Sequence, residues 1–135
     1  MLLLTDATWA QMVGHAYDGL PDEACGLLAG PPGTSRCTAF YACRNAAESS
    51  RVYTIDPKDH LRADRDAEGR GLEIFGVMHS HTHTDAYPSP TDVAQAPDPG
   101  WHYVIVSLRD EAPMLHSYRI IDGQVAEEPV SLIGG

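Results

Sequence analysis

Short apolar runs separated by polar turns dominate the chain and predict strands. The run 72–79 is apolar almost throughout, which is typical of a strand buried on both faces of a sheet. The run 101–108 is also strongly apolar, and the turns 30–33 and 122–123 predict hairpins between neighbouring strands. Further strands are expected at 1–4, 24–29, 36–43, 52–55, 114–121 and 124–130.

Three segments have the spacing or the starting signals of helices. Apolar positions follow helical spacing from about residue 6 to residue 20. A second, highly charged helix is expected over 57–68, with Asp56 as its N-cap. A short third helix is expected over 90–96, with Ser89 as its N-cap. This order of strands and helices predicts an α/β fold with a mixed sheet and flanking helices.

The composition is that of one domain with its own core. With 135 residues, 43% of them hydrophobic, we expect a single domain over 1–135. The net charge of −10 argues against nucleic acid or an anionic membrane as a partner. The three cysteines form no Cys-x-x-Cys pair, so core packing is expected rather than disulfides or a thiolate metal site. No run is long enough for a membrane span or a signal peptide, so a cytoplasmic location is expected.

A metal site is predicted at the end of the run 72–79. His79 and His81 are two residues apart, so in a strand their side chains project to the same side. Asp92 follows in the first turn of the expected third helix, three residues after Ser89. Two imidazoles and one carboxylate leave a fourth tetrahedral position open, which is typical of catalytic rather than structural zinc.

Simpler interpretations exist for each part of this pattern. A His-x-His pair is common without a metal, and Ser89 with Asp92 forms an ordinary acidic capping box. His83 continues the alternation of histidines, and Asp85 follows it in the same loop. Neither is expected to be a ligand. Asp85 is expected to be a loop residue or to contact a ligand residue, and for His83 a contact with a ligand residue or with the substrate is the alternative to a loop position.

The full pattern resembles the JAMM (MPN-plus, Mov34) metallopeptidase motif, in which His-x-His is followed after ten residues by Asp, with Ser three residues before the Asp. The sequence Pro-Asp-Glu-Ala-Cys-Gly-Leu-Leu-Ala-Gly at 21–30 also matches the family's N-terminal motif, which contains a glutamate. The resemblance covers essentially the whole chain. It implies a three-layer α-β-α sandwich of the cytidine-deaminase-like type, and one zinc ion per chain held by His79, His81 and Asp92.

The resemblance also implies roles and a substrate. Glu23 matches the catalytic glutamate, which moves protons between water and leaving amine. Ser89 matches the serine of the motif, and its hydroxyl can cap the helix, donate to the developing oxyanion, or do both. The likeness is strongest to bacterial hydrolases that release cysteine from the C-terminal glycine of a ubiquitin-like sulfur carrier protein. The expected partner is therefore such a carrier ending in Gly-Gly. Deubiquitinating members have Pro after the second histidine, where this chain has Thr82.

Several rival functions remain open. The chain could be an isopeptidase for another ubiquitin-like conjugate, or a non-catalytic MPN scaffold, although all expected ligands are present. The metallo-β-lactamase pattern His-x-His-x-Asp-His fails, because His83 and Thr84 occupy its last two positions. An amidohydrolase barrel needs about 250 residues, so this chain is too short for one.

Overall fold

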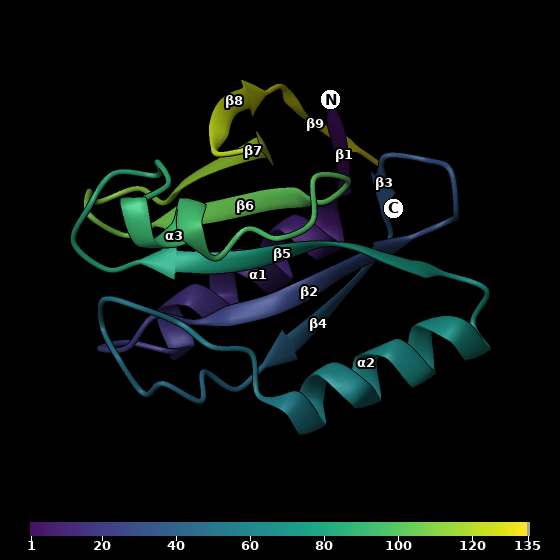
Figure 1. Ribbon diagram of the computed structural model, residues 1–135, viewed down its shortest axis with the longest axis horizontal. Coiled ribbons are helices and arrows are strands. Elements are labelled where there is room, and N and C mark those ends of the chain that lie inside the picture. The colour runs from purple at the N-terminus through teal and green to yellow at the C-terminus, as the bar shows by residue number, and fades with distance from the viewer. Residues whose placement is uncertain (135) are drawn as a thin grey trace.

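A six-stranded mixed sheet forms the centre of the computed structural model, which describes residues 1–134 (Figure 1). Its strand order is β4-β2-β5-β6-β7-β8. The strands are β2 (Cys25–Gly30), β4 (Ala39–Cys43), β5 (Glu73–His81), β6 (His102–Ser107), β7 (Met114–Ile121) and β8 (Gln124–Glu128). Within this sheet, β5 and β6 are the parallel pair and the other neighbours are antiparallel.

The two apolar runs singled out in the sequence become the two central strands, β5 and β6. All six residues of β6 are buried, as are the last seven of β5. Gly76 lies where these strands approach closely, because a Cβ at this position would come within 2.6 Å of the His102 carbonyl oxygen. The predicted burial of the 72–79 strand on both faces is therefore confirmed.

A smaller sheet, ordered β3-β1-β9, lies beside the large one. Its strands are β1 (Leu2–Thr5), β3 (Arg36–Cys37) and β9 (Val130–Ile133). The middle strand, β1, runs parallel to both neighbours. This sheet joins three segments that are distant in the sequence.

Helices cover both faces of the large sheet, as the sequence predicts. They are α1 (Asp6–Asp18), α2 (Pro57–Gly69) and α3 (Pro90–Ala94). On one face, Met12 of α1 packs in a core cluster with Met78 and Val104. On the other, Ala63 of α2 packs in a cluster with Val77, and Val93 of α3 lies against the same cluster. In Figure 1, α1 lies behind the sheet and α3 in front, so the expected three-layer α/β arrangement is confirmed.

Three predicted strands differ from the structure. The strand expected over 36–43 divides at Thr38, because β3 leaves the large sheet to pair with β1 while β4 stays beside β2. The strand expected over 124–130 divides at Pro129, which has no N–H for a sheet ladder. The strand expected over 52–55 is wrong, since β-type pairing is limited there to one isolated bridge between Asn45 and Ile55.

Among residues 1–134, no helix is both long and apolar enough to cross a bilayer. The expected cytoplasmic location stays a prediction. So does the single domain over 1–135, of which Gly135 lies outside the described residues.

Candidate metal centre

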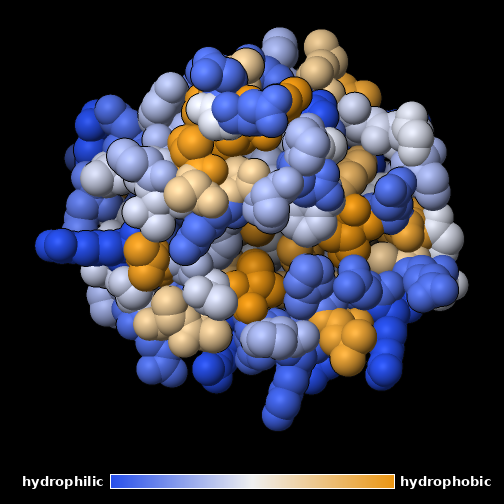
Figure 2. Space-filling view, viewed as in Figure 1, coloured by the Kyte–Doolittle hydropathy of each residue, from blue (hydrophilic) through white to orange (hydrophobic). Residues whose placement is uncertain are grey.

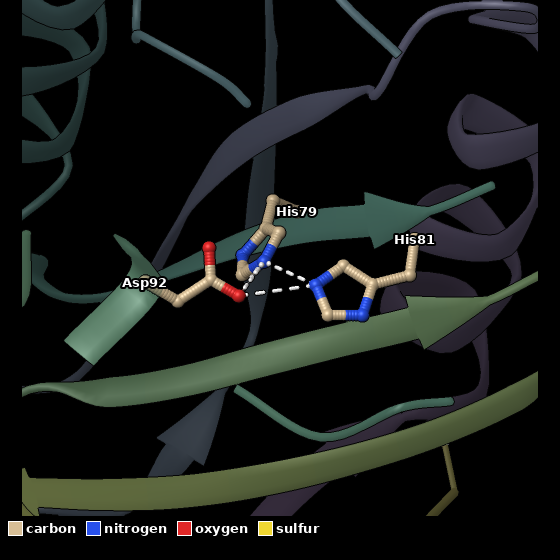
Figure 3. A group of neighbouring side chains, drawn as sticks. All are labelled: His79, His81 and Asp92. Carbon is tan, nitrogen blue, oxygen red and sulfur yellow. Dashed lines mark hydrogen bonds and ion pairs between the residues drawn. The ribbon is translucent and has the colours of Figure 1, made fainter. Parts of the chain in front are cut away.

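Three predicted ligands converge at one end of the large sheet. His79 and His81 point to the same side from the last residues of β5, and Asp92 reaches them from α3 (Figure 3). The two Nε2 atoms lie 3.1 Å apart. Oδ2 of Asp92 lies 3.1 Å from Nε2 of His79 and 3.0 Å from Nε2 of His81. Three donor atoms therefore form a nearly equilateral triangle.

The size of this triangle fits a zinc ion. Zinc binds imidazole nitrogen and carboxylate oxygen at about 2.0–2.2 Å, so the edges of its tetrahedron measure about 3.3–3.6 Å. The observed separations are only slightly shorter, and two nitrogens with one oxygen form a donor set that zinc accepts. The residues present therefore fit the metal that the motif implies.

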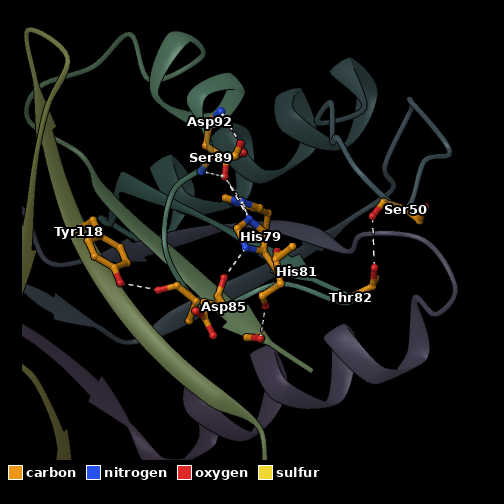
Figure 4. A network of polar contacts seen from close by, with 11 residues as sticks. Ser50, His79, His81, Thr82, Asp85, Ser89, Asp92 and Tyr118 are labelled. Atoms are coloured by element: carbon orange, nitrogen blue, oxygen red, sulfur yellow. Dashed lines mark hydrogen bonds and ion pairs between the residues drawn. The ribbon is translucent and has the colours of Figure 1, made fainter. Parts of the chain in front are cut away.

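Neighbouring groups fix the orientation of both imidazole rings. Nδ1 of His81 lies 2.6 Å from the main-chain oxygen of Asp85 and donates its proton there, which leaves Nε2 as a lone-pair donor toward the site (Figure 4). The ring of His79 stacks on that of Tyr53, with centroids 4.4 Å apart and planes inclined by 17°. Both rings are thus held in ligand geometry by side chains and main chain already in place.

The start of α3 holds Asp92. Ser89 and Asp92 form a reciprocal capping box, in which the Asp92 N–H donates to Ser89 Oγ (3.1 Å) and the Ser89 N–H donates to Asp92 Oδ2 (2.9 Å). Pro90 at the first helical position favours the helix start, because its missing N–H needs no partner there. The cap therefore also positions the carboxylate, and Ser89 Oγ keeps its own proton free to donate.

The charges of the cluster suit metal binding. Burial alone would raise the pKa of Asp92, but its contacts with His79 and His81 hold that pKa well below its usual range. Burial lowers the pKa of His79. Burial also opposes protonation of His81, but its contacts with Asp92 and the Asp85 carbonyl raise its pKa. A carboxylate and a neutral His79 are therefore available near neutral pH, and protons compete with a metal more strongly at His81 than at His79.

Glu23 lies buried beside this cluster. In the antiparallel pairing of β2 with β5, Cys25 is opposite His79. The pairing continues past the strand end, where the Ala24 N–H donates to Ser80 Oγ (2.7 Å) and the Ser80 N–H donates to the Ala24 carbonyl (2.9 Å). This register brings Glu23 level with His81, although the two motifs are distant in the sequence.

The Glu23 carboxyl is unusual for a buried acid. Its Oε1 is buried and has no hydrogen-bond partner among the described residues. Burial raises the pKa of Glu23 to about 7, and this shift is partly opposed by His81. A carboxyl with a pKa near the working pH is suited both to accept and to return a proton.

The two remaining predicted residues lie outside this cluster. His83 is exposed in the loop after β5. Asp85 contacts His81 only through its main-chain oxygen, while its carboxylate pairs with Arg109 at the surface. Asp85 therefore supports a ligand through its main-chain oxygen, and functional roles for His83 and Asp85 stay predictions.

Sequence reasoning missed three residues at the site. The Ser80 hydroxyl bonds the main chain next to Glu23, and the Tyr53 ring stacks on His79. The Asn45 side chain bonds the loop that contains Tyr53. The position of Ser80 between the two histidines was a usable signal. Tyr53 and Asn45 have no local pattern that identifies them, because their contacts depend on how the chain folds back.

An apolar pocket of about 370 Å³ lies next to the centre. Tyr53 lines this pocket with its ring and also stacks on His79, while Val77 lines it from the same face of β5. Trp101 and Tyr103 are further lining residues. Figure 2 shows this side of the molecule, where apolar side chains are gathered between hydrophilic ones. The Tyr53 ring therefore separates this pocket from His79.

Comparison with known proteins identifies relatives over most of the chain. The family model of the prokaryotic homologues of the JAB domain matches residues 5–121. A CysO-cysteine peptidase from Mycobacterium tuberculosis is 46% identical over 123 residues, covering 90% of this chain and 84% of the relative. A desampylase from Haloferax volcanii is 36% identical over 101 residues, covering 71% of this chain and 73% of the relative.

Solved structures agree with this relationship. A protein from Desulfitobacterium hafniense, known from its solution structure, aligns with a TM-score of 0.91 at 34% identity over 100% of this chain and 94% of its own. A JAB1/MPN domain protein from Archaeoglobus fulgidus aligns with a TM-score of 0.64 at 17% identity, covering 98% of this chain and 97% of its own, and this likeness concerns the fold alone. The chain therefore belongs to the prokaryotic homologues of the JAB domain.

Proposed function

We propose that this chain is a zinc-dependent peptidase that hydrolyses the amide bond after the C-terminal glycine of a ubiquitin-like sulfur carrier protein and releases cysteine. The observation that supports it most is the convergence of His79, His81 and Asp92 in a chain 46% identical to a CysO-cysteine peptidase. The resemblance of the sequence motifs to the cysteine-releasing branch points the same way. A cytoplasmic location is part of this proposal.

The buried groups around the ligands supply the proton transfers. Zinc with three protein ligands acts as a Lewis acid and lowers the pKa of water to about 7. Glu23, with its unpartnered oxygen and a pKa near 7, takes a proton from water and returns it to the leaving amine of cysteine. Desolvation by the surrounding core makes both transfers possible within one narrow pH range.

Ser89 is assigned to the carbonyl oxygen of the scissile bond. Its Oγ already accepts the Asp92 N–H, which fixes the direction in which its own O–H can donate. Negative charge develops on the carbonyl oxygen when water adds, so a donor placed there stabilises the transition state more than the substrate. The same hydroxyl thus caps α3 and serves the reaction.

The adjoining pocket fits the tail of the carrier. Glycines carry no side chain, so a Gly-Gly end can pass close to the buried ligands while a preceding apolar residue occupies the pocket beside Tyr53. In this proposal the last carbonyl of the extended tail lies toward Ser89. The narrow approach to the buried ligands supports selection of a glycine-terminated chain over an ordinary loop.

The test uses a sulfur carrier ending in Gly-Gly-Cys and intact-mass measurement. Zinc-loaded protein is expected to remove one cysteine residue, and a chelator or Asp92→Asn is expected to abolish the loss. His116→Gln is the matched control, because His116 contacts Glu127 on β8 and takes no part in the cluster. Absence of cleavage by a folded, zinc-loaded protein would remove this substrate.

A second candidate is hydrolysis of a ubiquitin-like protein from a lysine side chain, which the 36% identity to a desampylase favours. A carrier joined to a lysine ε-amine tests it in the same assay. Faster release of lysine-linked than of cysteine-linked carrier would favour this function. A non-catalytic scaffold need hold no metal, so zinc content separates it from both.

A further inference from the structure

Asn45 is the most heavily bonded polar side chain near the site, and none of the motifs includes it. Only 9% of it is exposed. Its Nδ2 donates to the carbonyl oxygens of Glu23 (3.0 Å), Val52 (3.0 Å) and Ser49 (3.4 Å). Its Oδ1 accepts the N–H groups of two further residues, each at 3.0 Å, Ala47 and Thr54. One amide therefore organises the whole segment from residue 45 to residue 55, which we call the strap.

The strap contacts the metal centre at three points. The Glu23 N–H donates to the Ser49 carbonyl (2.8 Å), so Asn45 and Ser49 hold the main chain of Glu23 from both its N–H and its C=O. The Tyr53 ring stacks on His79. Near the end of β5, the Thr82 hydroxyl donates to the Ser50 carbonyl (3.2 Å; Figure 4).

The strap has no regular structure that would hold it without Asn45. It contains no strand of the large sheet, and its pairing is one isolated bridge and a few main-chain bonds. An amide is well suited to the role, because one end donates and the other accepts. The partners of Asn45 are all main-chain groups, so loss of its amide would remove several main-chain hydrogen bonds at once, at a cost in stability.

We propose that Asn45 is a positioning residue, which holds the strap against the main chain of Glu23 and so sets where the Glu23 carboxyl lies relative to the ligands. This inference rests on the proposed function for its effect on catalysis. The structural argument for the inference does not depend on that function. The Glu23 carboxyl makes no hydrogen bond through Oε1, so the position of the carboxyl depends on the main chain of Glu23. A displacement of about 1 Å is enough to reduce turnover by about a hundredfold.

Two substitutions test the inference, with one matched control. Asn45→Asp keeps the acceptor for Ala47 and Thr54 but removes the donor to Glu23. Asn45→Ser removes these contacts without adding charge, and replaces the first variant if that one fails to fold. In the control, Thr34→Ala removes a hydroxyl that bonds only locally at the surface, outside the strap.

With the carrier substrate, both Asn45 variants are expected to lower kcat at least about tenfold, with KM and zinc content unchanged, while the control stays within about twofold. In a Glu23→Gln background the Asn45 substitutions are expected to add less than about twofold, because they act through Glu23. An unchanged kcat, or an equal further loss in the Glu23→Gln background, would overturn the inference.

Residue-resolved amide exchange of the metal-free protein supplies a readout that needs no activity. The Glu23 amide is expected to exchange at least about tenfold faster in both Asn45 variants, with the β5 amides unchanged and the control altering neither. If wild-type protein cleaves no carrier, the proposed function fails and this exchange alone decides the inference. Unchanged Glu23 exchange, or equal loosening of β5, would overturn it.

Discussion

At the scale of single residues, burial of the Glu23 carboxyl lowers the stability of the fold and suits the carboxyl to catalysis. Its carboxyl is removed from water without receiving a full set of hydrogen bonds, which is why its pKa rises to about 7. An ionised carboxylate in this place is unfavourable for folding but useful for proton transfer. Substitution of Glu23 should therefore raise the stability of the fold and sharply lower catalytic activity.

Glu23→Gln should stabilise the metal-free protein above neutral pH. The folded-state pKa of about 7 lies above the ordinary 4.5, so the folded protein holds this proton more tightly and loses stability as pH rises between these values. The variant should gain about 1–3 kcal/mol over wild type at about pH 8, with little gain at about pH 4. Urea denaturation with a chelator at both pH values measures the difference. Equal effects at both would show that Glu23 does not titrate as described.

In the zinc-loaded protein the same substitution should lower kcat by about 10²–10⁴-fold, which is the usual contribution of a general acid–base group. Zinc content, measured on the same sample, should stay at one ion per chain, because Glu23 is outside the ligand triangle. A variant that lost its zinc would place Glu23 among the ligands instead.

Ser89→Ala separates the two tasks of Ser89. Loss of the cap alone should cost about 1 kcal/mol of folding free energy. Loss of a donor to the oxyanion should lower kcat by about 10²–10³-fold. Ser89→Thr keeps a hydroxyl for both tasks and serves as the control. If Ser89→Ala only melts earlier, with kcat near wild type, the capping box accounts for Ser89 entirely.

At the scale of elements, the parts that sequence predicted are those set by local signals. α1 begins at Asp6, where helical spacing begins, α2 follows its predicted cap Asp56, and β5 follows its apolar run. The wrongly predicted strands lie where segments distant in the sequence compete as hydrogen-bonding partners. Residues 36–43 divide because β1 offers a second partner, and residues 52–55 bond to the Asn45 side chain instead of a strand. Such preferences leave no periodic pattern in the sequence.

The metal ligands were predictable for the same reason, since His79 and His81 share a strand face and Asp92 a helix start. Their connection to Glu23 was not predictable from local pattern, because it depends on the register of β2 against β5. The family resemblance, rather than any spacing, supplied that part of the site.

Ser80→Ala tests this connection between β2 and β5. The Ala24 N–H would lose its 2.7 Å partner in a buried place, which should cost about 1–3 kcal/mol. Thr34→Ala is the control, since the Thr34 hydroxyl bonds only locally at the surface. Thermal or urea unfolding measures both variants. A Ser80 variant as stable as its control would mean that water or the main chain replaces the lost acceptor.

At the scale of the whole molecule, the metal links the central strand of the sheet to the helix that follows it. β5 provides two ligands and α3 the third, so an ion bound there ties the end of the central strand to a short helix of five residues. In the unfolded chain the three ligands are not held in this geometry, so the unfolded chain binds the metal much more weakly. Metal affinity is therefore folding free energy, and both depend on the same protonation states.

Zinc at about a hundredfold excess over its Kd should add about 2.7 kcal/mol to the free energy of unfolding at about pH 7.5. The increase should shrink as pH falls below about 6, because protons then compete with zinc for the imidazoles. His81 should titrate first as pH falls, since its pKa is raised while that of His79 is lowered. Thermal melts with and without zinc across this range measure the effect. Asp92→Asn should respond much less to zinc, and an equal response would place the ion at another site.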